Sequence, residues 1–235
     1  MANFKTARTV DMKLSNVRLS YAWLFKPREN VDVKTGVKKV SYEATFLWPA
    51  SIPLVGVTQA GQPVTVSNEM LRIAEESWPG KAAEMLKAEV LKNPIKSGDG
   101  KDGIVKKTME KKPGYAGMKF LQAKSNADSP PLLISNVLGA DGKLVKLTDP
   151  SSLYSGCYVN AVVQAYTWQH GEGGCGISFG MSMIQFAKDG ERLGGGTARP
   201  SAEQLEKDAG AFFQGAAPEK VAAVKDGEGA AGLFA

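Results

Sequence analysis

The chain has 235 residues, of which 43% are hydrophobic and 23% are charged, and this is ordinary globular material. It contains no run of eighteen apolar residues and no apolar segment near its N-terminus, so we expect neither a membrane-spanning helix nor an export signal. Residues 1–190 hold 24 Lys and Arg against 17 Asp and Glu, whereas residues 191–235 hold 5 against 7. A basic body with a weakly acidic end predicts a polyanionic partner.

Two strands are predicted within the first fifty residues, where apolar and polar side chains alternate. The first covers residues 10–21, and Trp23 and Phe25 follow it in a predicted loop that runs through Pro27. The second carries an aromatic-rich face made of Val40, Tyr42, Ala44, Phe46 and Trp48. Its other face consists of Lys39, Ser41, Glu43 and Thr45. We expect the polar face to be solvated and the aromatic face to be buried, with Trp48 best placed to be an exception.

Two helical stretches follow. Ser67 or Asn68 can cap a helix that runs towards Glu76, because both side chains can accept a hydrogen bond from the first turn. Pro79 and Gly80 interrupt this pattern, and helical spacing resumes over residues 81–92. The two stretches are predicted to form one helical insertion in a chain that otherwise consists of strands.

The segment after the helices has no sustained period. Residues 93–117 are rich in Gly, Lys and Pro, which predicts a long loop that is either functional or disordered. Nine lysines lie between residues 92 and 124 against three acidic residues, and Tyr115 and Phe120 lie among them. A lysine run alone is typical of a solvated loop, but positive charge combined with stacking rings is typical of proteins that bind single-stranded nucleic acids. Strands are predicted to resume at residues 118–123 and 132–137.

A late hairpin is the strongest pattern in the chain, with strands at residues 156–169 and 175–186 around a Gly-rich turn. In the first strand the odd positions are small and apolar, as in a tightly curved barrel interior; they are Cys157, Val159, Ala161, Val163, Ala165 and Thr167. In the returning strand the inward set is predicted to be Cys175, Ile177, Phe179, Met181 and Met183. This hairpin is therefore expected to form part of a barrel wall.

The other face of the hairpin has an unusual composition. Its first strand presents Tyr158, Asn160, Val162, Gln164, Tyr166 and Trp168, while its second presents only Gly and Ser. Rings interleaved with amides are unfavourable in a core, because a buried amide without a partner costs about 1–3 kcal/mol. Glycine in a strand often marks the close approach of a ligand or another backbone. We interpret this face as a platform for bases, the alternative being a face covered by another part of the chain.

The C-terminal part has a different composition, rich in Ala, Gly and Glu. Ser201 with Gln204 resembles a capping box for a short helix that ends near Phe213. Residues 216–235 can bury too little apolar surface to fold alone, so we predict a mobile tail. The order of five or six strands with one helical insertion predicts a small closed or half-closed β-barrel rather than a parallel doubly wound sheet.

No pattern in the sequence indicates catalysis. Cys157 and Cys175 would lie at opposite ends of the hairpin, too far apart for a disulfide, so both are expected to be reduced and buried. His170 is the only histidine and lies in the Gly-rich turn, where it is expected to be a surface residue. There is no Cys-x-x-Cys pair and no phosphate loop, and the carboxylates occur singly. We therefore expect no catalytic residues, no metal site and no cofactor.

Several segments carry a resemblance to a known family. They are VRLSYAWLFKP (17–27), SYEATFLWP (41–49), GDGK (98–101), YAGMKFLQA (115–123), YSGCYVNAVVQAYTW (154–168) and CGISFGMSMIQFAKDGERLGG (175–195). In this order and spacing they resemble bacteriophage replicative single-stranded-DNA-binding proteins, which are built on a single OB-fold. The resemblance implies sequence-independent coating and protection of single-stranded DNA during phage DNA replication, recombination and repair, in the cytoplasm of the infected bacterium. It also implies a flexible tail, Gly215–Ala235, that contacts other phage replication proteins.

Together these observations predict a mainly β chain. Residues 1–196 are expected to form an OB-fold-like five-stranded barrel with a helical insertion, and residues 197–235 a short helix and a flexible, weakly acidic tail. The residues predicted to stack bases are Tyr158, Tyr166 and Trp168, assisted by Tyr115, Phe120, Trp23 and Phe25. Those predicted to neutralise phosphates are Lys106, Lys107, Lys111, Lys112 and Lys119.

Two other classes of function remain open at this point. One is a phage DNA-processing enzyme such as a nuclease, and the other is a phage structural or assembly protein that uses the aromatic face as a subunit interface. The sequence also leaves open the oligomeric state, a homo-oligomer included, as well as the binding-site size, the preference for DNA over RNA and any strand-annealing activity.

Overall fold

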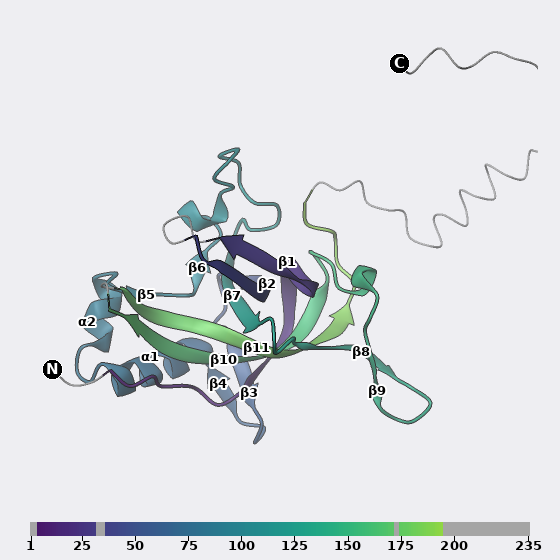
Figure 1. Cartoon of the computed structure of the whole chain (residues 1–235), viewed down its shortest axis with the longest axis horizontal. Helices are drawn as coiled ribbons and strands as arrows, with labels where there is room; N and C mark the ends of the chain where they lie inside the picture. Colours follow the sequence, from purple (N-terminus) through teal and green to yellow (C-terminus); the bar gives the residue numbers. More distant parts are fainter. Residues whose placement is uncertain (1–3, 32–35, 172–173, 195–235) are drawn as a thin grey trace, which may run out of the picture. The chain divides into compact units, whose positions relative to one another are not determined.

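The computed structural model describes residues 4–31, 36–171 and 174–194, and strands dominate this part of the chain (Figure 1). The long strands are β1 (Met12–Val31), β2 (Lys38–Pro49), β7 (Met118–Asn126), β10 (Tyr158–His170) and β11 (Gly174–Lys188). The shorter strands are β3 (Val55–Thr58), β4 (Pro63–Thr65), β5 (Leu91–Lys92), β6 (Lys96–Ser97), β8 (Leu132–Leu138) and β9 (Leu144–Lys146). The helices are α1 (Val66–Ser77) and α2 (Ala82–Lys87), with short 3₁₀ turns η1 (Lys101–Gly103) and η2 (Pro150–Ser152). None of the helices in the described ranges is long and apolar enough to cross a membrane.

The five long strands close into a barrel. β1 pairs with β2 on one side and with β10 on the other, and β2 pairs with β7. β11 pairs antiparallel with β10 and parallel with β7, which completes the ring. This mainly β, five-stranded closed barrel confirms the predicted OB-fold class.

The core of the barrel is supplied by the alternating positions that the sequence indicates. All the odd positions of β10 from Cys157 to Thr167 are buried, as predicted. On β2, Ala44, Phe46 and Trp48 are buried too, so that Trp48 is no exception, whereas Val40 is exposed and Tyr42 half-buried at the start of the same face. The predicted helix is confirmed as α1, which packs against β10 and buries one apolar stripe, namely Val66, Met70, Ile73 and Ala74. The predicted cap is wrong, because the N-cap residue is Thr65 and both Ser67 and Asn68 lie inside the first turn. The second helical stretch is shorter than predicted, because Leu91 and Lys92 leave it to pair as β5 with β11.

The first strand continues well beyond the predicted end, and the expected loop around Pro27 is wrong. Trp23 and Phe25 lie within β1, which pairs with β2 up to Val31. The register of this pair shifts between Ser20 and Trp23 and again between Trp23 and Arg28. Pro27 falls inside the second irregularity, where the strand needs no backbone donor, and a proline is therefore tolerated.

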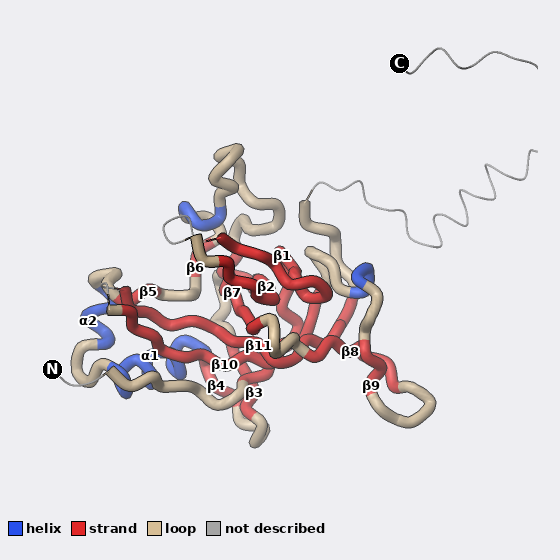
Figure 2. The backbone as a smooth tube through the Cα atoms, viewed as in Figure 1, coloured by secondary structure: helices blue, strands red, loops and turns tan. Residues whose placement is uncertain are grey.

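Half of the polar face of β2 is buried, contrary to expectation, while Lys39 is exposed and Ser41 is half-buried. Glu43 and Thr45 are buried, and Leu47 on the same face packs with Tyr115 and Phe120. The covering side chain of Tyr115 belongs to the long loop between β6 and β7, residues 98–117, which we call the basic loop (Figure 2). This face of β2 is therefore enclosed between the barrel and the basic loop.

A bulge changes the alternation of β11. Val162 pairs with Met183 and Val163 pairs with Met181, so Ser182 is an extra residue on β11. Ile177, Phe179 and Met181 face inward as predicted, but beyond the bulge the fully buried residue is Ile184 and not Met183. A one-residue insertion reverses the two faces of a strand, which is the reason for this error.

Two further parts complete the description. β8 pairs parallel with β11 and antiparallel with β9, and the β8–β9 hairpin projects from the barrel (Figure 1). Cys157 is buried and Cys175 is half-buried rather than buried, and both are unpaired thiols, as expected for reduced cysteines. The predicted helix at residues 201–213 and the predicted tail at residues 216–235 lie outside the described residues, so the domain boundary at residue 196 stays a prediction.

Candidate nucleic-acid interface

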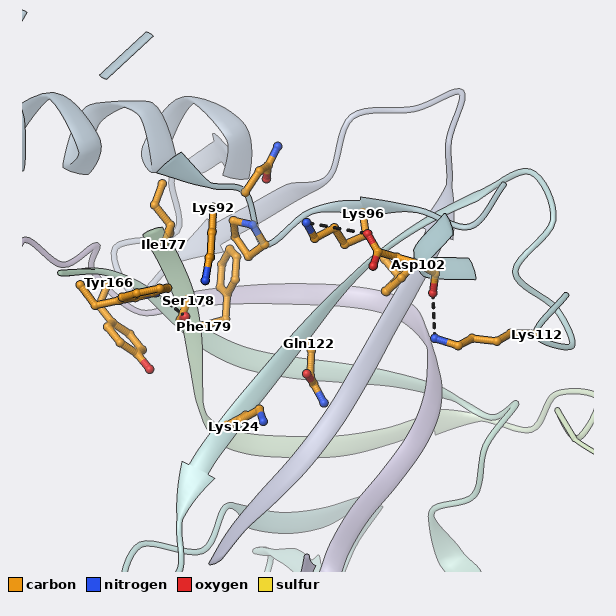
Figure 3. A pocket seen from close by; sticks show the side chains of 14 residues that line it. Lys92, Lys96, Asp102, Lys112, Gln122, Lys124, Tyr166, Ile177, Ser178 and Phe179 are labelled. Carbon is orange, nitrogen blue, oxygen red and sulfur yellow. Dashed lines mark hydrogen bonds and ion pairs between the residues drawn. The ribbon is translucent and has the colours of Figure 1, made fainter. Parts of the chain in front are cut away.

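Two adjoining cavities on one side of the barrel form a continuous depression, which we call the groove. The first, of about 420 Å³, lies between β5, β7 and the β10–β11 hairpin and includes Lys92, Lys124, Tyr166, Trp168 and Ser178 in its lining (Figure 3). The second, of about 340 Å³, lies over β1 and β2 beside the basic loop and includes Tyr21, Arg28, Glu43, Lys101 and Lys106. Both cavities share Asp102, Lys112, Phe120 and Gln122. The groove therefore combines rings, amides and charged side chains, and its lining comes from all five barrel strands and the basic loop.

The Trp168 ring has a fixed position at one end of the groove. Its Nε1 donates a hydrogen bond of 2.9 Å to Ser178 Oγ, and Lys92 Nζ lies 5.5 Å from the centre of the ring. A Cβ atom on Gly176 would lie 2.8 Å from Trp168 Cζ2 and 2.9 Å from Lys92 Cβ. The missing side chain at Gly176 thus makes room for the indole of this chain, and not directly for a ligand as the glycine pattern suggested. The indole is held in place before any nucleic acid arrives.

We expect Gly176→Ala to weaken the binding of single-stranded nucleic acid several-fold, by less than the loss of the ring itself, because the new methyl group must displace either Trp168 or Lys92. A fluorescence titration with oligo-dT measures the affinity, and the intrinsic emission of the variant reports a changed tryptophan environment. Gly180→Ala is the matched control on the same strand, since a Cβ there would approach nothing closer than Gln164 O at 3.8 Å. Equal losses for both variants would show that the position of the ring is not the cause.

Lys112 holds the basic loop against the barrel. Its Nζ donates a hydrogen bond of 2.8 Å to the backbone oxygen of Asp102. The same ammonium lies 5.3 to 5.6 Å from three ring centres, those of Tyr21, Tyr115 and Phe120. Burial lowers the pKa of Lys112, an effect that the nearby carboxylate of Asp102 opposes. Lys112 is therefore a cation engaged with its own chain, although it was predicted to serve phosphates.

Tyr115 and Phe120 were predicted to assist in stacking, but both are buried. The Tyr115 residue is 1% exposed, its hydroxyl donates to Ser20 Oγ at 3.3 Å, and its ring centre lies 4.9 Å from that of Phe120. Phe120 is 8% exposed and borders both cavities of the groove. Tyr115 therefore offers no ring face to a base, because it packs between the basic loop and β2, and little of Phe120 is accessible.

The burial of Tyr115 has a consequence at high pH. Burial raises the pKa of this phenol from 10.0 to about 12, against the opposing effect of the Ser20 hydrogen bond. The unfolded chain then ionises at a lower pH than the folded one, so the free energy of unfolding should fall as the pH rises from 10 to about 12. Denaturant titrations of the wild type and Tyr115→Phe at pH 9 to 11.5 measure this loss. The advantage of the wild type over the variant should shrink with rising pH, and a constant difference would contradict the assignment.

The remaining predicted site residues are not brought together by the fold. Trp23 is 43% exposed beside Arg28, whereas Phe25 packs against the barrel core, and neither lines the two cavities. Tyr158 lies ten residues from Trp168 along β10, about 33 Å in an extended strand, and its ring contacts Lys188. Among the predicted lysines Lys106 and Lys112 line the groove, and the three that do not are Lys107, Lys111 and Lys119. Of the predicted set, the residues that line the groove are therefore Tyr166, Trp168, Tyr115, Phe120, Lys106 and Lys112, although Tyr115 is buried in its wall.

Sequence reasoning missed several residues of the groove. Lys92 and Lys124 belong to the lysine run but were not selected, and Gln122 lies on β7 between the two cavities. Glu43 and Arg28 line the second cavity. Lys92 and Lys124 could have been selected from the lysine run. Glu43 could be found only from the pairing of β2 with β7, which sets it opposite Lys124. Among the described residues, no group of three His, Cys, Asp or Glu side chains could hold a metal ion.

Comparisons with known proteins assign the family. The sequence model of the family of the Enterobacter phage Enc34 ssDNA-binding protein matches residues 10–212. The chain belongs to this family. The chain is also 31% identical over 194 residues to putative protein p50 of Acyrthosiphon pisum secondary endosymbiont phage 1, across 79% of this chain and 87% of that protein. The resemblance stated from the sequence motifs is thus confirmed.

Two solved structures are similar to this member of the Enc34 family. One is the single-stranded DNA-binding protein from bacteriophage Enc34 in complex with ssDNA, at 19% identity over 83% of this chain and 100% of that one, with a TM-score of 0.46. The other is gp2.5, a single-stranded DNA-binding protein encoded by bacteriophage T7, at 13% identity over 85% and 97% of the two chains, with a TM-score of 0.38.

Proposed function

We propose that this chain binds single-stranded DNA in the groove, without preference for sequence and without catalysis, during phage DNA replication. The observation that carries the proposal is the Trp168 ring, held by Ser178, Gly176 and Lys92 at one end of a groove with lysines along its length, in a member of the Enc34 family. The named relatives of known function are ssDNA-binding proteins. Coating of the phage's single strands takes place in the host cell, where phage DNA is replicated.

The groove provides both interactions that sequence-independent binding requires. Trp168 and Tyr166 offer rings on which bases stack, and stacking is worth about 1–3 kcal/mol per base whatever the base is. Lys92, Lys101 and Lys106 line the same groove and can neutralise phosphates. One OB-fold occupies about 4–16 nucleotides, so a short oligonucleotide is sufficient to fill the site.

The roles in recombination and repair, and the recruitment of replication proteins through Gly215–Ala235, stay predictions from the resemblance. The absence of catalysis is likewise a proposal. It is supported by the naming of the relatives as binding proteins, and it requires a direct assay.

Fluorescence anisotropy tests the proposed function. The labelled ligands are an oligo-dT of about 20 nucleotides, the duplex of the same length and the matching RNA. Tight binding of the single strand that weakens as salt rises is the expected result. The same mixtures, incubated with Mg²⁺ or Mn²⁺ and separated on a denaturing gel, should show intact DNA. Metal-dependent cleavage would support the nuclease alternative. Self-association without any oligonucleotide binding would support the structural alternative.

A further inference from the structure

A buried carboxylate lies in the wall of the groove. Glu43 on β2 lines the second cavity, and its side chain is 2% exposed. An acidic residue in a site for a polyanion is unexpected, because it repels the phosphates that the site must accept. Glu43 must therefore serve a purpose other than attraction of the nucleic-acid strand.

The carboxylate is bound by two cations that flank it. Lys124 Nζ on β7 donates a hydrogen bond of 2.8 Å to Glu43 Oε1, and an Arg28 guanidinium nitrogen on β1 lies 3.7 Å from Oε2. Both cations are about half exposed, with side-chain exposures of 49% and 47%. Lys124 lines the first cavity and Arg28 the second, so both border the groove while they are engaged with Glu43.

Neutral donors complete the shell around Glu43. Gln122 Nε2 donates to Oε2 at 3.1 Å, and Ser41 Oγ and Asn30 Nδ2 each donate to Oε1 at 3.0 Å. Burial raises the pKa of Glu43, but the hydrogen bond and charge of Lys124, together with Ser41 and Arg28, outweigh burial and lower it overall. Glu43 is therefore ionised at neutral pH, and its oxygens are occupied by groups of its own chain.

We propose that Glu43 sets which part of the nucleic acid the adjoining part of the groove accepts. Because Glu43 engages Lys124 and Arg28, this part takes bases and leaves the phosphates to Lys92, Lys101 and Lys106. This inference rests on the proposed function and adds to it the orientation of the bound strand in the groove. A phosphate that contacted Lys124 would lie close to the ionised carboxylate in a partly dry site, where like charges repel strongly. A base carries no charge, so it meets no such repulsion. Glu43 is in this sense a positioning residue, which acts through the two cations that it holds.

The test compares a normal strand with a strand that has no bases. The affinities of the wild type and Glu43→Gln are measured for oligo-dT and for an abasic deoxyribose-phosphate oligomer of the same length, over a range of salt. The wild type should strongly prefer oligo-dT. In Glu43→Gln the cations are released, so the preference should fall by about tenfold or more as repulsion is lost. The log–log salt slope should also steepen by about 0.7 to 1.4, for one or two added phosphate contacts.

Glu29→Gln is the matched control, because Glu29 is an exposed carboxylate of β1 that lies 4.0 Å from the exposed Lys38. This variant should change neither the preference nor the slope. A purely structural role of Glu43 would lower the affinities for both oligomers in parallel and leave their ratio unchanged. That outcome would overturn the inference.

Lys124→Gln in the wild-type background provides a second measurement, which does not depend on the stability of Glu43→Gln. With Glu43 present, Lys124 is not a phosphate ligand, so its replacement should leave the salt slope of oligo-dT binding unchanged. In the Glu43→Gln background the same replacement should reduce the slope by about 0.7. A reduction already seen with Glu43 present would overturn the inference. Failure of the wild type to bind oligo-dT at all would instead overturn the proposed function, so the two failures are distinguishable.

Discussion

Replacing Trp168 by alanine should weaken the binding of oligo-dT by about 5- to 150-fold, because the loss of one stacking ring costs about 1–3 kcal/mol and 1.4 kcal/mol corresponds to a factor of ten. The upper part of this range is expected here, since the ring is already held by Ser178 and Lys92 and little freedom is lost when a base stacks on it. Anisotropy titrations at one fixed salt concentration measure the effect. The dissociation rate should account for most of the change.

Trp168→Phe separates stacking from simple loss of structure. Phenylalanine keeps a ring at the same place but loses the donor to Ser178, so it should retain most of the affinity that alanine loses. Trp78→Phe serves as a control, because Trp78 packs on Phe4 and does not line the groove. Equal losses for the alanine and phenylalanine variants of Trp168 would contradict a stacking role, provided that both variants unfold at the wild-type denaturant concentration.

Replacing Lys92, Lys101 and Lys106 together by glutamine should reduce the log–log salt slope of oligo-dT binding by about 2, because each lost phosphate contact on a single strand contributes about 0.7. All three lysines line the groove, from both of its cavities. The affinity should fall most at low salt and converge with that of the wild type at high salt, since phosphate contacts act through the release of counterions. Titrations at four or more salt concentrations measure the slope.

A second triple variant controls for net charge. Lys87, Lys143 and Lys146 are exposed and lie outside both cavities, so replacing them removes the same charge without removing groove contacts. Its slope should stay close to that of the wild type, with a small general loss of affinity. Equal slopes for the two triple variants would mean that the lysines of the groove have no special role and that binding follows net charge alone.

The parts of the fold that could be predicted are those in which a strict period of two persists over many residues. The odd positions of β10 from Val159 to Thr167 face the core for this reason, and they are all buried. The same regularity led to the barrel class and to Tyr166 and Trp168 as groove residues. Period alone is sufficient here because a long strand of a closed barrel has one face that must be dry.

The residues that could not be predicted depend on irregularities or on partners far along the chain. Ser182 adds one residue to β11 and reverses its faces, and nothing in the alternation marks the place where it does so. The sequence predicts that Tyr115 is an accessible ring in a lysine-rich loop, but contacts with Ser20 and Phe120 bury it. The alternation of β2 predicts that Glu43 is solvated, but the pairing of β2 with β7 places Lys124 opposite it. Each of these errors comes from an irregularity in strand pairing or from a tertiary contact, and neither leaves a signal in the alternation of the sequence.

The last described strand, β11, has an unusual number of neighbours, since it pairs with β5, β7, β8 and β10. It closes the barrel against β7, and it carries the glycine and the serine that hold Trp168. During synthesis on a ribosome all the other strands emerge before it. A nascent chain therefore has the lysines of the groove before it has a platform for bases, and the platform can assemble only after β11 has left the ribosome.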